Sequence, residues 1–196
     1  MENRVKYRFS FTAASLMYAD LVHFAKLMVE DGYSLEKLKP ELLSRNREKT
    51  NKREFAELFL RLKTLTEKEI LLLTNGNIEV QKLICLVAFA RAYRFFRDFL
   101  EEVVQEKISL FDFKISDLDY YSFVNKKAID HEELDQLAPS TRGKVKQVIF
   151  KVLHQAGLID NIKDRNIVIP IVDLQLSETI LETNPRDLKI LLYNLP

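Results

Sequence analysis

The sequence predicts a mainly α-helical, compact fold with a winged helix-turn-helix-like segment and one small β-hairpin in its C-terminal third. Apolar residues recur at helical spacing through most of the 196 residues. Only four glycines occur, and Gly32, Gly76 and Gly157 each follow a segment of helical pattern, where a left-handed residue commonly ends a helix. One short stretch, 158–169, has the composition of two strands joined by a polar turn.

The sequence predicts four helices in the N-terminal part of the chain. The first is expected over residues 13–30, with a narrow polar stripe of Asp20, His23 and Lys26 on an otherwise apolar surface, so it should be largely buried. A second should run from Ser34 and be divided by Pro40. A third carries an apolar face made of Phe55, Leu58, Phe59 and Leu62. Thr66 and Glu69 form a capping-box pattern that opens the fourth.

The middle of the chain predicts one long helix over residues 77–106, which is apolar for most of its length and should form the centre of the fold. Its arginines Arg94 and Arg97 each have a carboxylate four residues later, so they are expected to form surface ion pairs. Ser116 with Asp119 is another capping pattern, which begins a helix through residue 124.

In the last third of the chain, the predicted elements follow the order of a winged helix-turn-helix. A short helix over 131–137 and a turn at Pro139 precede a helix over 141–156, which Gly157 ends. The hairpin pairs 158–162 with 167–169, and Ser177 and Asn184-Pro185 open two short terminal helices. The most plausible division separates an N-terminal helical domain, 1–110, from a winged-helix-like region with terminal helices, 111–196.

Composition argues against several classes of protein. The net charge of +1 excludes a strongly basic nucleic-acid-binding protein, so such binding would have to come from local clusters. The single cysteine, Cys85, lies in an apolar run and reads as a buried hydrophobic residue. No apolar run is long enough to span a bilayer, and the first residues lack the apolar core of a signal peptide. We therefore expect a soluble, cytoplasmic protein without a membrane partner.

The helix over 141–156 carries the clearest candidate site. Its apolar residues share one face, and the other face is basic, in a segment without acidic residues between Asp135 and Asp160. Lys and Arg neutralise phosphates, and a helix fits the major groove of DNA. The candidate contacts are Arg142, Lys144, Lys146, Gln147 and Lys151, with Lys163 and Arg165 at the tip of the predicted hairpin. Phe150 in the middle of this face suggests a contact, with a partner or with another helix of the chain. The alternative is a solvent-facing side of an amphipathic helix.

A second basic cluster lies near the start of the third predicted helix, where backbone amides add to the attraction for phosphate. The alternative is a solvated loop. This cluster contains Arg45, Arg47, Lys49, Lys52 and Arg53.

Enzymatic motifs are not recognisable. The three histidines lie far apart and none has a Cys or acidic partner at metal-ligand spacing. The sequence contains no glycine-rich phosphate loop and no nucleophile elbow. Acidic residues such as Asp117, Asp119 and Asp130 read as helix caps and solubilising charge. We expect no catalytic residue, no metal and no cofactor.

Several segments, in the same order along nearly the whole chain, resemble the BrxA family of the BREX bacteriophage-exclusion system. The strongest is 140–159, Ser-Thr-Arg-Gly-Lys-Val-Lys-Gln-Val-Ile-Phe-Lys-Val-Leu-His-Gln-Ala-Gly-Leu-Ile. The others are Phe9-Ser-Phe-Thr12, Arg61-Leu-Lys-Thr-Leu65, Arg91-Ala-Tyr-Arg-Phe95 and Phe123-Val-Asn-Lys-Lys-Ala128. The resemblance implies a helical fold similar to NusB, an RNA-binding antitermination factor, association with double-stranded DNA, and no known catalytic activity.

The leading hypothesis is therefore a non-catalytic DNA-binding component of a phage-defence system, with other BREX proteins as partners. Two alternatives remain. A protein-assembly adaptor would use exposed aromatic residues such as Phe150, Tyr120 and Tyr121. A NusB-like factor would bind single-stranded RNA, which rests on analogy of fold alone.

Overall fold

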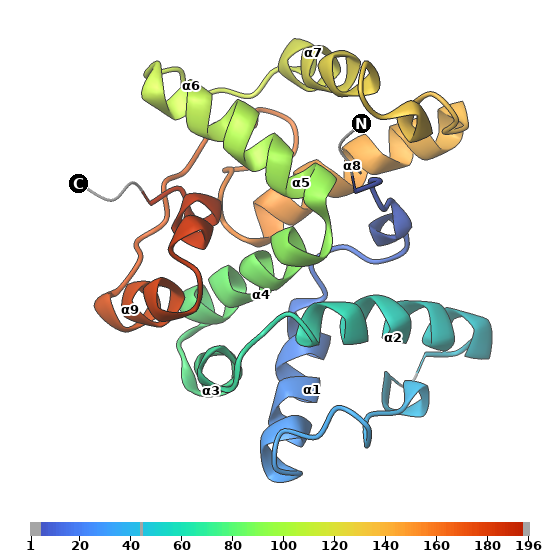
Figure 1. Cartoon of the computed structure of the whole chain (residues 1–196), viewed down its shortest axis with the longest axis vertical. Coiled ribbons are helices and arrows are strands. Elements are labelled where there is room, and N and C mark those ends of the chain that lie inside the picture. The colour runs from blue at the N-terminus through green and yellow to red at the C-terminus, as the bar shows by residue number, and fades with distance from the viewer. Residues whose placement is uncertain (1–4, 44, 194–196) are drawn as a thin grey trace.

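A buried helix, α4 (Ile78–Ala92), lies at the centre of the fold, and α1, α2, α3, α5 and η5 pack against it (Figure 1). The computed structural model describes residues 5–43 and 45–193. Asn77 caps the first turn of α4 through its side-chain oxygen, which accepts a hydrogen bond from the amide of Val80 at 2.9 Å. Nearly every side chain from Val80 to Ala90 is buried, so α4 is surrounded by protein on all sides.

The N-terminal half surrounds the lower part of α4 in Figure 1. Helices α1, α2 and α3 all pack against α4. The elements in this half are the short 3₁₀ helices η1 (Ser10–Ala13) and η2 (Pro40–Leu43), and the helices α1 (Tyr18–Glu30), α2 (Glu48–Leu62) and α3 (Glu67–Asn75).

The C-terminal half covers the upper part of the molecule and one side of α4. Its helices are α5 (Arg94–Phe99), the π-helical turn η3 (Leu100–Val104), α6 (Gln105–Ser109), α7 (Asp117–Ala128), η4 (Glu132–Leu134), α8 (Pro139–Gln155), α9 (Leu174–Thr183) and η5 (Pro185–Leu191).

The prediction of one continuous helix over 77–106 is wrong. The backbone of Tyr93 is extended, with φ −129° and ψ 91°, and this residue separates α4 from α5. The Tyr93 hydroxyl contacts Glu57 and Arg61 of α2, so the break turns this side chain toward a neighbouring helix. No proline or glycine stands at this position, which is why apolar periodicity alone cannot locate it.

Two predicted helix starts are confirmed. In both capping boxes the side chain of the first residue accepts from the third helical amide, and the acidic side chain accepts in return. The pairs are Thr66 with Glu69 at the start of α3 and Ser116 with Asp119 at the start of α7. Asn184 likewise caps η5 as expected. Ser177, however, lies inside α9, because Asp173 caps this helix four residues earlier.

The glycine predictions hold at two of three positions. Gly32 and Gly157 have positive φ after α1 and α8, as predicted. Gly76 has φ −66°, so a left-handed conformation does not explain it. A Cβ at Gly76 would meet the Leu72 carbonyl at 2.6 Å and the Val80 side chain at 2.8 Å. Gly76 is therefore required by the close approach of α3 and α4.

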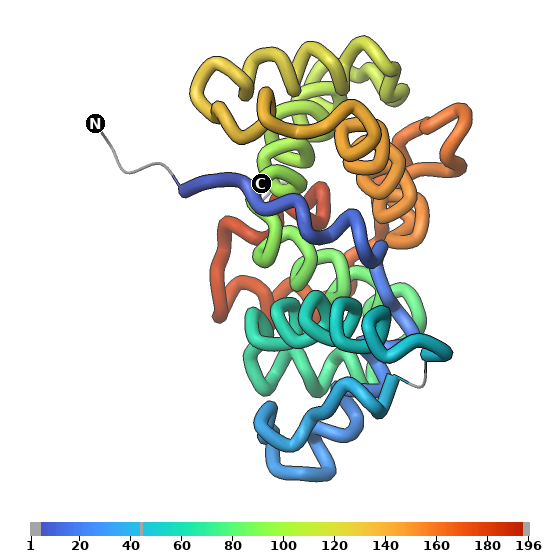
Figure 2. The backbone as a smooth tube through the Cα atoms, turned by 90° about the vertical axis from the view of Figure 1, so that its right-hand side faces the viewer, coloured from blue at the N-terminus to red at the C-terminus, as the bar shows by residue number. Residues whose placement is uncertain are grey.

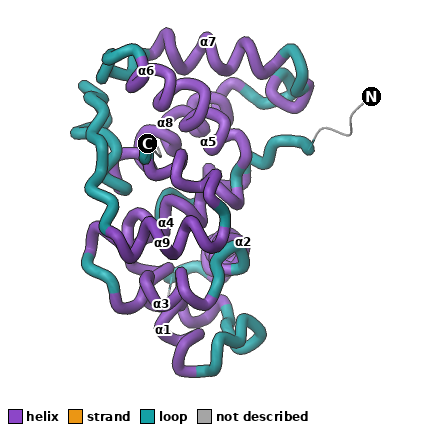
Figure 3. Tube along the Cα trace, turned by 60° about the vertical axis from the view of Figure 1, so that its left-hand side comes forward, coloured by secondary structure: helices purple, strands orange, loops and turns teal. Residues whose placement is uncertain are grey.

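The predicted β-hairpin is not formed, and the described residues contain no β-strand (Figure 3). Residues Ile159 and Ile167 form only an isolated bridge. The other edge of the second arm faces the loop after α6, where Ile167 donates to the Phe113 carbonyl at 2.7 Å and Asn166 bridges Lys114. Each contact is a single bridge, so neither edge of this arm forms a ladder.

Two other N-terminal expectations also need correction. The helix expected from Ser34 is reduced to the single turn η2. The first helix begins at Tyr18, because residues 14–17 are irregular, with Ala14 extended and Met17 at positive φ. The core is one continuous cluster of buried residues from Tyr7 to Leu192. The division near residue 110 stays a prediction.

Within residues 5–43 and 45–193, no helix combines the length and the apolar character needed to cross a membrane.

Candidate nucleic-acid interface

Helix α8 presents a narrow polar stripe to solvent. Lys144, Gln147 and Lys151 are exposed, and their spacing of three and four residues puts them on one face. The opposite side packs into the core through Val145, Val148, Ile149, Val152 and Leu153. The Lys144 ammonium donates to the Gln147 side-chain oxygen at 3.0 Å, which leaves its remaining N–H groups to the solvent. This part of the predicted basic face is confirmed as exposed.

The two predicted basic clusters meet in one groove. Lys144, Gln147 and Lys151 of α8 line it on one side, and Arg45, before α2, and Arg53, inside α2, line it on the other. Two carboxylates, Asp20 and Glu54, also line the groove, and both pair with Arg45. The groove has a volume of 610 Å³. The sequence could not show this convergence, because about a hundred residues separate the two clusters.

The segment between η1 and α1 forms the wall that joins the two sides of the groove. In Figure 2 the N-terminal segment crosses the face of the molecule between α7 and α2 and reaches α8. The Leu16 amide donates to the Gln155 side chain at 3.1 Å, which ties this wall to α8.

A buried arginine that sequence reasoning missed supports this wall from behind. Arg61 of α2 is 0% exposed, and its guanidinium donates to the carbonyls of Ala14 at 2.7 Å, Ser15 at 2.5 Å and Leu16 at 3.1 Å. It also lies over the ring of Phe89, 4.6 Å from the centroid. Periodicity assigns Arg61 to the end of an amphipathic helix, and only its position next to apolar residues hints at burial.

Inside the α2 cluster, the cations divide into paired and unpaired groups. Arg45 contacts Asp20 at 2.6 Å and Glu54 at 2.8 Å, and hydrogen bonding by Glu54 raises the pKa of this arginine. Lys52 pairs with Glu48 at 2.6 Å. Among the described residues, no ion-pair partner lies within reach of the exposed side chains of Arg47, Lys49 and Arg53.

Two further predicted DNA contacts, Lys146 and Arg165, form ion pairs with the same carboxylate. Asp117 at the start of α7 pairs with Lys146 at 2.8 Å and also with Arg165. Hydrogen bonds from Lys146 and then Arg165 hold the pKa of Asp117 below its usual value. Lys146 also lies over the ring of Tyr121, 4.5 Å from its centroid. Neither cation points freely into solvent.

The expectation that Phe150 lies on an exposed face is wrong. Its side chain is 2% exposed and packs against Phe99 and Tyr120, with Arg165 4.1 Å above its ring. Of the two tyrosines singled out with it, Tyr120 is buried and Tyr121 is exposed. The second possibility raised by the sequence, packing within the chain, is the one that the structure shows.

The remaining predicted contacts lie outside the groove. Arg142 donates to the carbonyls of Asp135 at 2.8 Å and Leu137 at 3.1 Å, so it fastens the start of α8. Lys163 is exposed in a turn that the Asn161 side chain holds by accepting from the amides of Lys163 and Asp164.

The arginines of the central region form a second network that was only partly expected. The pairs Arg94 with Asp98 and Arg97 with Glu101 are present, at 3.8 Å and 2.8 Å. Arg91 was not assigned a partner from sequence. It binds two buried carboxylates, Glu69 at 2.6 Å and Asp187 at 2.7 Å, and so joins α3, α4 and η5.

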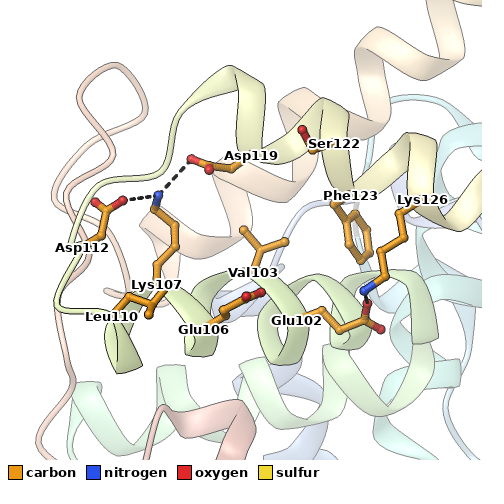
Figure 4. A pocket seen from close by; sticks show the side chains of 10 residues that line it. All are labelled: Glu102, Val103, Glu106, Lys107, Leu110, Asp112, Asp119, Ser122, Phe123 and Lys126. Atoms are coloured by element: carbon orange, nitrogen blue, oxygen red, sulfur yellow. Dashed lines mark hydrogen bonds and ion pairs between the residues drawn. The ribbon is translucent and has the colours of Figure 1, made fainter.

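Another cavity, of 380 Å³, lies between α6 and α7 (Figure 4). Four carboxylates line it, and all of them except Glu106 contact a lysine. Lys107 contacts Asp112 at 2.6 Å and Asp119 at 3.2 Å, and Lys126 contacts Glu102 at 3.2 Å. In the described part of the chain, no group of three or more His, Cys, Asp or Glu side chains is arranged to hold a metal ion.

Comparison with known proteins gives the following similarities. The BrxA family model matches residues 5–184. The chain is 27% identical over 180 residues to the BREX protein BrxA of Bacillus cereus (strain H3081.97), which covers 89% of this chain and 90% of that protein. It is 30% identical over 118 residues to the BREX protein BrxA of Escherichia coli O9:H4 (strain HS), covering 60% and 55%. A crystal structure of an uncharacterized protein from Magnetospirillum magneticum has the same fold, with a TM-score of 0.79, 16% identity, and coverage of 95% and 98%.

Proposed function

The chain belongs to the BrxA family, and we propose that it is a non-catalytic component of a BREX phage-defence system that binds double-stranded DNA. Its curated relatives are BREX proteins, which supports a role in such a system with other BREX proteins as partners. The observation that supports DNA binding is the groove in which two basic clusters, distant in sequence, face each other.

The groove offers positive charge that is not already neutralised. Arg53, Lys144 and Lys151 line it without an ion-pair partner among the described residues, and Arg47 and Lys49 stand exposed beside it at the start of α2. Cations of this kind neutralise phosphates and release condensed counterions. The groove is formed by α8, by α2 and by the segment between η1 and α1, which Arg61 fixes in place. The charges are therefore held on rigid elements.

Binding through phosphates carries little sequence information, because all sites of a duplex present the same backbone. Gln147, between the two lysines on α8, is the one lining side chain of the predicted set that could both donate to and accept from a base edge. We therefore propose binding that tolerates many sequences.

Fluorescence anisotropy with a labelled 20-base-pair duplex over a salt series tests this proposal. The variant Arg53→Gln/Lys144→Gln/Lys151→Gln removes three groove charges, and Lys26→Gln/Lys39→Gln/Lys68→Gln removes three exposed charges elsewhere. Each lost phosphate contact lowers the slope of log affinity against log salt by about 0.9, so the groove variant should lose up to about 3 in slope. The control variant should retain the wild-type slope.

Absence of binding by folded wild-type protein at low salt would overturn the proposal, as would equal losses in the two variants. Unlabelled single-stranded RNA serves as competitor. If RNA displaces the duplex at lower concentration than unlabelled duplex does, the groove belongs to an RNA-binding protein instead.

The assembly-adaptor function is the second candidate, and one surface favours it. The turn after α6 exposes two large apolar side chains, Leu110 and Phe111, with Phe111 84% exposed, and Leu118 in the first turn of α7 is also largely exposed. Apolar side chains gathered on a surface commonly mark protein contacts. Phe111→Ser/Leu118→Ser should abolish co-purification with other BREX proteins and leave duplex binding intact. Unchanged co-purification would contradict the adaptor function.

A further inference from the structure

A second concave site lies between the N-terminal segment, α5 and η5. It has a volume of 720 Å³, within the range of small-ligand sites, and is larger than the groove. Basic side chains dominate its lining. These are Arg91, Arg94, Arg97, Arg186 and Lys189, against the two acidic residues Asp98 and Glu101.

The carboxylates around this site already have partners. Glu69 and Asp187 are completely buried, and both form ion pairs with Arg91. Asp187 also lies 3.0 Å from Arg97. Glu101 forms an ion pair with Arg97 at 2.8 Å.

Asp98, the remaining carboxylate, accepts from the Tyr7 hydroxyl at 2.6 Å and lies 3.4 Å from Lys127. Its contact with Arg94 is the longest ion pair of the site, at 3.8 Å.

Three cations therefore remain with little or no compensation. Arg94 is exposed and makes only the 3.8 Å contact, and the exposed side chains of Arg186 and Lys189 have no ion-pair partner within residues 5–43 and 45–193. They come from segments about ninety residues apart, which meet because η5 packs against α4 and η3. A cluster of guanidinium and ammonium groups on a concave surface is the arrangement that binds phosphate oxygens.

We propose that this site binds a phosphate group, either of a free nucleotide-like molecule or of a DNA backbone that extends beyond the groove. The guanidinium groups of Arg94 and Arg186 and the ammonium group of Lys189 would bind the phosphate oxygens. Arg91 and Arg97 form the base of the site, where their ion pairs with buried carboxylates hold them in place. The N-terminal segment runs from Val5 at this site to the groove wall at Thr12. Its length is at most about 25 Å when extended, and it carries exposed Lys6 and Arg8.

Isothermal titration calorimetry with inorganic pyrophosphate at low ionic strength tests the site without DNA. Wild-type protein should bind, and Arg94→Gln/Arg186→Gln/Lys189→Gln should bind at least tenfold more weakly. Lys26→Gln/Lys39→Gln/Lys68→Gln, with the same change of net charge, should bind as wild type. Because all three site residues are exposed, the triple variant should fold normally, and circular dichroism verifies this.

No pyrophosphate binding by wild type, or an equal loss in the control variant, would overturn the proposal. Repeating the titration with saturating duplex distinguishes the two sources of phosphate. Displacement of pyrophosphate, together with weaker duplex binding by the site variant, identifies a backbone phosphate, and unchanged binding identifies a free ligand. The DNA-binding proposal can fail separately, since the pyrophosphate titration contains no duplex.

Discussion

Replacing Arg61 by leucine should be among the most destabilising single substitutions in this chain. The guanidinium is completely buried and satisfies the carbonyls of three consecutive residues, 14–16, at the turn that enters α1. Its Nε also lies 3.3 Å from the Tyr93 hydroxyl, which in turn donates to the buried carboxyl group of Glu57. Leucine fills part of the volume and supplies no donor.

The magnitude follows from what the substitution leaves behind. Three carbonyls would lose charge-assisted hydrogen bonds, and the Tyr93 hydroxyl, which donates to Glu57, would lose the Arg61 donor. Removing one partner of a buried charged network costs about 3–5 kcal/mol. In a domain of this length one kcal/mol corresponds to about 2–4 °C, so Tm should fall by roughly 6–20 °C.

Thermal and urea denaturation followed by circular dichroism measures this difference. Arg142→Leu is a matched control, because Arg142 also donates to backbone carbonyls but is about half exposed, and it should cost less than about 1 kcal/mol. If Arg61→Leu costs no more than Arg142→Leu, the account of Arg61 as the support of the groove wall is refuted.

Three further outcomes follow from particular contacts. Phe150→Ala should cost about 3–5 kcal/mol in urea denaturation, because the ring is buried, whereas an exposed phenylalanine would cost far less. Asp117→Asn should release Lys146 and Arg165 and strengthen duplex binding in the anisotropy assay; weaker binding would contradict this. Because the pKa of Asp117 is lowered in the folded state, its contribution to stability is present at neutral pH and is lost as pH falls through the folded-state pKa. The difference in unfolding free energy between wild type and Asp117→Asn should therefore disappear in acid. Burial raises the pKa of Cys85 to about 12, so iodoacetamide at pH 8 should label it only after unfolding, as mass spectrometry would show.

Features set by a few neighbouring residues could be predicted from the sequence. The capping boxes at Thr66 and Ser116 and the left-handed ends at Gly32 and Gly157 all formed as expected. Each depends on backbone groups within four residues, so tertiary contacts do not alter them.

Features set by distant contacts could not be predicted. The break at Tyr93 depends on a hydroxyl that reaches Glu57 on another helix. The two arms of the predicted hairpin meet at a single bridge, and Ile167 also bonds to Phe113, about fifty residues earlier. Periodicity reports only whether a face is apolar, and it does not identify the segment that will cover a polar or aromatic face.

The charges of the candidate interface also depend on distant contacts that the sequence does not reveal. Sequence identified the basic stretches, but five of the predicted cations have carboxylate partners, and these are Arg45, Lys52, Arg142, Lys146 and Arg165. Whether a lysine is available to phosphate depends on which carboxylate the fold brings to it.

The near-zero net charge is consistent with a basic groove, because charges of opposite sign lie on different parts of the surface. Interior pairs such as Arg91 with Glu69 cancel in the net charge. Exposed carboxylates outside the groove, such as Glu67, Glu79 and Glu178, offset the unpaired cations that line it. A cation paired in the interior and a cation exposed in the groove count equally in the net charge, but only the second attracts a phosphate. The potential of the groove is therefore determined by side chains such as Arg53 and Lys151, which have no ion-pair partner among the described residues, and by how rigidly Arg61 holds the wall between them.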